Sequence, residues 1–170
     1  LSWDDPVDKY LPGFAGVKVA GKGPAARVPR VRELLSHTAG FPANAVRRSG
    51  QWDMKAGGTL AEAADDAARE GLASEPGSGF AYTGLGYVVA GRIAEVVTGR
   101  EFCALMKERL FLPIGATTAT FYSSASGGLK EQMPTMYERR SGRLVEADIA
   151  ARAEAAAAFP NPGGGLISTL

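Results

Sequence analysis

Two short segments of the chain carry residue types that could do chemistry. The first is Ser36–Gly40, which holds the only histidine, His37, between a serine and a threonine. The second is Phe80–Gly84, with Tyr82 at its centre. Imidazoles and phenols are among the groups that move protons in enzymes, and an imidazole near a serine raises the possibility of a Ser-His arrangement. Both residues therefore have to be weighed as catalytic groups and as parts of the scaffold.

Other candidate sites are explained more simply by structure. Asp4–Asp5 is expected to cap a short helix, and Asp65–Asp66 to form a solvated helix face. The glycines at 163–165 are not followed by the Lys-Ser/Thr of a phosphate-binding loop, so a tight turn is expected there. Cys103 has apolar helical neighbours and no basic cluster to lower its pKa, which favours a structural thiol. The residues around His37 offer no spacing of metal ligands, so we expect no metal site.

Composition narrows the class of protein. The 170 residues are 45% hydrophobic and 22% charged, as in ordinary folded domains. Nineteen Lys and Arg balance eighteen Asp and Glu, so we expect no nucleic-acid partner. The apolar runs are far shorter than the roughly 20 residues that span a bilayer, so we expect no membrane-spanning segment. A single domain of mixed helices and short strands is the expectation.

Hydrophobic periodicity and capping residues predict where the elements lie. A Thr59 to Glu62 capping box starts a helix that runs to Gly71. The sequence signals for the elements before and after this helix are shorter or less regular. We expect one or two helical turns over 4–12, loop over 13–27, helices over 29–40, 86–98 and 102–113, a hairpin pairing 133–138 with 143–145, and an alanine-rich helix over 146–158.

Six motifs in order make the chain resemble the β-lactamase-related serine hydrolases, the group of class C β-lactamases, penicillin-binding proteins, D-alanyl-D-alanine carboxypeptidases and esterases. They are Asp-Asp-Pro-Val to Tyr-Leu-Pro at 4–12, Leu-Leu-Ser-His-Thr-Ala-Gly at 34–40, Pro-Gly-x-x-Phe-x-Tyr at 76–82 with Gly-Tyr at 86–87, Thr-Gly at 98–99, Pro-Ile-Gly-Ala at 113–116, and Gly-Gly-Leu-x-Ser-Thr at 164–169. Each motif is weak alone, whereas six in the family's order are specific.

The resemblance implies the fold and the chemistry. It implies an α/β (α+β) fold of the β-lactamase/transpeptidase type, with residues 1–170 forming a single partial domain, mainly the helical lobe. The family's Ser-x-x-Lys and Lys-Thr-Gly elements do not occur in this sequence, so we expect an internal fragment that packs against flanking segments of the same fold. The implied partner is a small-molecule amide or ester, without a cofactor, and the implied location is bacterial, periplasmic or extracellular.

The resemblance also implies roles for particular residues. Tyr82 would take the proton of the nucleophilic serine and pass it to the leaving group, while Thr83 and Gly84 would line the substrate site. Gly84 departs from the family, which has an Asn here whose amide donates to the carbonyl of the substrate's acyl side chain. Ser36, His37 and Gly40 would support the site from behind.

Three alternatives stay open. One is a small independent helical interaction module, which requires residues 1–170 to fold alone. Tyr82 could be a loop tyrosine packed by its ring, and the protein could be a non-catalytic or truncated member that binds a ligand without turnover.

Overall fold

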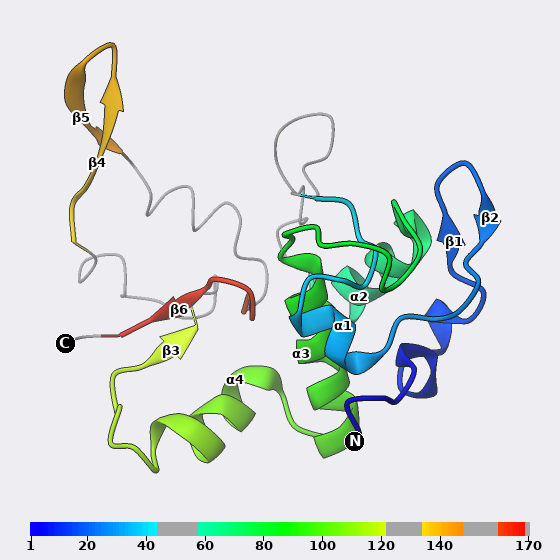
Figure 1. The fold of residues 1–170 in the computed structure, drawn as a ribbon. Helices are drawn as coiled ribbons and strands as arrows, with labels where there is room; N and C mark the ends of the chain where they lie inside the picture. Colours follow the sequence, from blue (N-terminus) through cyan, green and yellow to red (C-terminus); the bar gives the residue numbers. More distant parts are fainter. Residues whose placement is uncertain (44–57, 122–133, 148–159, 169–170) are drawn as a thin grey trace.

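The computed structural model describes residues 1–43, 58–121, 134–147 and 160–168. In these ranges helices combine with three two-stranded antiparallel sheets, which confirms the predicted mixed class. Figure 1 shows the helices α1 to α3 gathered on one side, with the hairpin β4–β5 projecting on the other. Of the predicted alanine-rich helix, residues 148–158 lie outside the described ranges, and residues 146–147 belong to strand β5.

The N-terminal segment is helical as predicted, but its turns are of the narrower 3-10 type. It forms two 3-10 turns, η1 (Val7–Lys9) and η2 (Pro12–Phe14), in place of α-helical turns over 4–12. The predicted aspartate cap is wrong, because Pro6 is the N-cap and no side chain bonds there. Asp5 instead accepts hydrogen bonds from Lys9 Nζ and Tyr10 Oη. These two bonds, Lys9's first, hold the pKa of the Asp5 carboxyl well below its ordinary value.

The predicted loop over 13–27 also contains a small hairpin. Strand β1 (Lys18–Val19) pairs with β2 (Gly23–Pro24). Its turn is possible because Gly21 and Gly23 take positive φ angles of 73° and 94°, which glycine adopts without steric cost.

The helix predicted over 29–40 is shorter in the structure. Helix α1 spans Val31–Leu35, and the chain leaves it at His37, whose φ is 59°. Helix α2 spans Leu60–Glu70 and confirms the capping box: Glu62 N donates to Thr59 Oγ1 (3.2 Å), and Thr59 N donates to Glu62 Oε2 (2.9 Å).

The next two predicted helices are confirmed. Helix α3 spans Leu85–Thr98 and ends at Gly99, which has φ 64°. Helix α4 spans Phe102–Met106 and widens into a π-type turn, η3, over Lys107–Phe111. Burial raises the pKa of Cys103 on α4, and the charge of Glu101 adds to the effect, as expected for a structural thiol.

The strands of the second half are short. Strand β3 (Thr120–Phe121) pairs with β6 (Leu166–Ile167), which brings the glycine-rich turn at 163–165 back toward the helices. Strands β4 (Met136–Arg140) and β5 (Arg143–Ala147) form the predicted hairpin. Ser141 and Gly142 at its tip both have positive φ angles, as a two-residue hairpin turn requires.

Helix α3 lies at the centre of the helical core. Its buried residues Leu85, Val89 and Ile93 pack in one cluster with α1, α2 and the N-terminal segment. Val88 faces a second cluster with Phe102 and Phe121. The approach of α1 is close, because a Cβ on Gly86 would overlap the carbonyl oxygen of Leu34.

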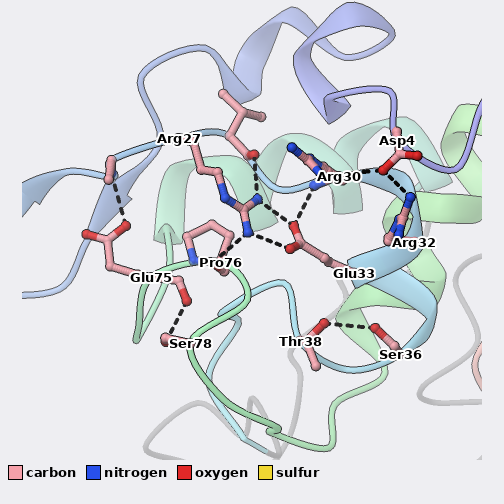
Figure 2. A network of polar contacts seen from close by, with 12 residues as sticks. Asp4, Arg27, Arg30, Arg32, Glu33, Ser36, Thr38, Glu75, Pro76 and Ser78 are labelled. Carbon is pink, nitrogen blue, oxygen red and sulfur yellow. Dashed lines mark hydrogen bonds and ion pairs between the residues drawn. The ribbon is translucent and has the colours of Figure 1, made fainter.

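A network of polar contacts ties α1 to the turn at Pro76 (Figure 2). Glu33, only 8% exposed, receives Arg27 Nη1 on Oε2 at 2.8 Å and Arg27 Nη2 on Oε1 at 2.6 Å. Arg30 N also donates to Glu33 Oε2 (2.8 Å), and Arg27 Nη2 donates to the Pro76 carbonyl (2.7 Å). Burial raises the pKa of Glu33, but these donors and the charges of Arg27 and Arg30 outweigh it and leave that pKa below its ordinary value.

Replacing Gly86 by Ala should destabilise the complete protein by about 1–3 kcal/mol, because the methyl group must push α1 away from α3. The measurement is urea unfolding of both forms. Gly84→Ala is the matched control, since a Cβ there meets nothing within 4 Å and φ is −72°. Equal unfolding midpoints for the two variants would contradict the close approach.

Replacing Glu33 by Gln should cost the complete protein about 1–3 kcal/mol at pH 7, because the Arg27 guanidinium loses its carboxylate. The folded-state pKa of Glu33 is lowered, so its stabilisation is present above the unfolded pKa of about 4.3 and is lost as pH falls through the folded value. Unfolding free energies measured from pH 7 to pH 3 should therefore converge for the two forms.

The matched control is Glu108→Gln. Glu108 pairs with Arg100 at the surface, where both side chains are about half exposed, and such pairs contribute little. A loss at Glu33 no larger than at Glu108 would show that the buried pair does not stabilise the fold.

Candidate active site

His37 joins the two segments that the sequence singles out. Its carbonyl accepts from Ala81 N (2.9 Å), and its Nδ1 lies 3.1 Å from the carbonyl oxygen of Thr83 and 3.4 Å from Thr83 N. The imidazole ring is tilted against Tyr82, with ring centroids 4.6 Å apart. The left-handed backbone at His37 turns its carbonyl and its ring toward the same segment.

Two more aromatic rings surround the imidazole. Phe80 meets it edge-on at 5.7 Å, and Tyr87 lies at 5.4 Å while its hydroxyl donates to the Leu35 carbonyl (3.2 Å). Ser36 Oγ lies 2.8 Å from Thr38 Oγ1, a contact visible in Figure 2. Nδ1 thus faces backbone and the Ser36 hydroxyl faces Thr38, a geometry that supports the scaffold role predicted for this loop.

Gly40 anchors the other end of the loop. Its carbonyl accepts from Ala73 N (2.8 Å) and Ser74 N (3.2 Å), and its φ is 90°. A side chain at this position would collide with the Ser74 carbonyl, so the turn needs glycine. Thr38 O accepts from Gly77 N (2.8 Å). The loop therefore fixes the strand-like segment that leads to Tyr82 at several points.

The three residues predicted to line the site differ in exposure. Tyr82 is 61% exposed, and its hydroxyl has no hydrogen-bond partner in the part of the chain that the structure describes. Thr83 is 3% exposed, and its Oγ1 accepts from Leu85 N (3.3 Å) at the start of α3. Gly84 is open to solvent on the side where a Cβ would stand.

The structure adds a segment that sequence reasoning did not place here. A Cβ on Gly163 would lie 3.4 Å from both Cα and O of Gly84, and 3.3 Å from Oδ1 of Asn161. The turn at 161–165 therefore sits beside Gly84 although about 80 residues separate them. The sequence offered the family motif at 164–169 as a signal, but the sequence analysis predicted only a tight turn there.

The described ranges hold no cluster of three or more His, Cys, Asp or Glu side chains that could bind a metal ion. No helix in the same ranges has the length and apolar character needed to cross a bilayer. What the site offers is an exposed phenol on a fixed loop, next to an open glycine and a glycine-rich turn.

The chain is similar to several known proteins. Penicillin-binding protein 4* of Bacillus subtilis strain 168 is 30% identical over 125 residues, covering 72% of this chain and 26% of that protein. Lovastatin esterase of Penicillium rubens is 29% identical over 146 residues, covering 83% of this chain and 36% of the esterase. The solved structure of EstCE1, a hydrolase with promiscuous acyltransferase activity, matches with a TM-score of 0.78 at 24% identity, over 99% of this chain and 49% of its own.

The chain thus spans about a quarter to a half of the proteins it resembles. A sequence model of the family described as Beta-lactamase matches residues 1–170, the whole chain. Because this match covers every residue, and because the six motifs stand in the family's order, the chain belongs to the beta-lactamase family.

Proposed function

We propose that the complete protein is a serine hydrolase that forms an acyl-enzyme on an amide or ester substrate, with Tyr82 as its proton-transfer group. Residues 1–170 contain no Ser-x-x-Lys, so the serine and its lysine are proposed to come from another segment, and this chain alone is proposed not to turn over substrate. Relatives named as penicillin-binding protein and esterase support the hydrolase class.

The observation that carries the proposal is the state of Tyr82. A residue that only fills space would bury its ring, whereas Tyr82 is 61% exposed and its hydroxyl is not engaged by any described residue. Its backbone is held on both sides, by Ala81 N on His37 O and by Thr83 on His37 Nδ1. A fixed backbone and an accessible hydroxyl are what a positioned acid–base group needs.

In the proposed mechanism a proton is transferred through one oxygen atom, that of Tyr82. The serine oxygen attacks the substrate carbonyl carbon, and the hydroxyl proton passes to the oxygen of Tyr82, which acts as a phenolate in the complete protein. The proton then moves to the leaving nitrogen or oxygen as the bond to the carbonyl carbon breaks, which leaves the acyl-serine. Water repeats the sequence in reverse and releases the acid.

A second function is a ligand-binding member without turnover. The observation that favours it is the glycine at position 84, where the resemblance implies a substrate-binding Asn. Labelling the complete protein with a fluorescent fluorophosphonate and a fluorescent penicillin separates the two. Labelling by neither probe would favour the non-catalytic member.

Tyr82→Phe in the complete protein should lower kcat/KM for a 4-nitrophenyl ester by about 100-fold or more, because proton transfer by a positioned group contributes roughly that much. The matched control is Tyr87→Phe, which removes the other phenol beside His37 and should stay within a few-fold of wild type. Activity of Tyr82→Phe as high as that of Tyr87→Phe would remove Tyr82 from the mechanism.

A further inference from the structure

The hairpin of β4 and β5 has no part in the proposed catalytic step, and it projects away from the helices α1 to α3 (Figure 1). Its paired positions run from Met136↔Ala147 at the base to Arg140↔Arg143 at the tip. Ala147 is buried, whereas all residues from 139 to 144 are exposed. A two-stranded hairpin by itself is marginally stable in water, so a surface that covers this one would stabilise it.

The tip of this hairpin is basic. Residues 139–143 read Arg-Arg-Ser-Gly-Arg, three cations with no acidic residue among them. Arg140 pairs with Glu138 on its own strand. Arg139 donates to a backbone carbonyl of the turn at 3.2 Å, and neither Arg139 nor Arg143 forms an ion pair with a residue that the structure describes. The described part of the chain therefore leaves two guanidinium charges at the tip without a counter-charge.

Apolar side chains lie next to these cations on one face of the hairpin. The register places Leu144 opposite Arg139. Tyr137, two residues before Arg139 in the same strand, points to the same face. Leu144 is 67% exposed and Tyr137 is 62% exposed, and the acidic residue of this face, Glu146, lies opposite Tyr137 on the side away from the tip. Exposed apolar groups combined with cations are typical of segments that bind the surface of an anionic bilayer.

We propose that the β4–β5 hairpin is a peripheral docking element for an anionic lipid surface. Tyr137 and Leu144 enter the boundary between headgroups and acyl chains, which suits a tyrosine because one end of its ring is apolar and the other is polar. Arg139 and Arg143 bind the lipid phosphates, since an arginine keeps its charged end in the polar layer while its stem lies along apolar surface. The exposed leucine and tyrosine favour a lipid surface over a soluble polyanion, for which cations alone suffice.

The test is co-sedimentation of the complete protein with two kinds of vesicle, phosphatidylcholine alone and phosphatidylcholine mixed equally with phosphatidylglycerol. The protein should bind the anionic vesicles far better, and added salt should weaken that binding. Arg139→Gln combined with Arg143→Gln should weaken it by about tenfold or more, because each arginine near an anionic surface contributes roughly fivefold.

The matched control is Lys18→Gln combined with Lys22→Gln. It removes the same charge from exposed positions of the β1–β2 hairpin and should leave binding to anionic vesicles within about threefold of the unchanged protein. Equal losses for the arginine pair and the lysine pair would show that net charge, and not this hairpin, governs binding, and would overturn the assignment.

One further variant separates a lipid surface from a soluble polyanion. Leu144→Gln keeps every charge, so it should lower binding to anionic vesicles about fivefold and leave retention on a heparin column unchanged. Urea unfolding midpoints equal to that of the unchanged protein would confirm that the variants fold. Equal binding to both kinds of vesicle, or no loss for Leu144→Gln, would overturn the assignment, and the latter together with retention on heparin would identify a polyanion as the partner. Vesicle binding is measured without turnover, so a protein that binds but hydrolyses no ester would contradict only the proposed function.

Discussion

The paired charges of Arg27 and Glu33 are the interaction on which the geometry of the site depends. A guanidinium that bonds both carboxylate oxygens and the Pro76 carbonyl leaves little freedom to any of the three segments it joins. Helix α1 runs from this pair into His37, and the Pro76 turn runs from it into Tyr82. The two site segments thus start from one fixed point and meet again where the imidazole contacts Thr83.

The second constraint is the set of glycines on and near helix α3, where the lack of a side chain lets other segments approach. Helix α3 presents Gly86 to the Leu34 carbonyl and Gly91 to Pro162, and at its N-terminus Gly84 lies beside Gly163. At Gly86 the Leu34 carbonyl, and at Gly91 the Pro162 ring, come closer than a Cβ would permit, whereas a Cβ on Gly84 would meet nothing within 4 Å. Glycine therefore serves here to bring two segments that are distant in sequence, α1 and the turn at 161–165, onto one helix.

These two constraints also explain what the sequence could predict. Helices α2 and α3 were predictable because their signals are local: an apolar face, a Thr59–Glu62 capping box and terminal glycines. The left-handed turn at His37 and the role of Asp5 were not, since both depend on partners that folding supplies. The family motifs singled out Tyr82 and the His37 loop as candidates, yet no local pattern could place Gly163 beside Gly84.

The surroundings of Tyr82 show which requirements of proton transfer these segments can meet. Among the described residues Tyr82 makes a ring contact with the imidazole of His37, and its neighbours Ala81 and Thr83 are hydrogen-bonded to that same histidine. Contacts of this kind can hold a phenol in place, but proton transfer from a serine also needs a cation close to the phenol to stabilise the charged form. On the proposed mechanism these segments therefore hold Tyr82 in place, and we propose that the cation beside it comes from the segment that carries the serine.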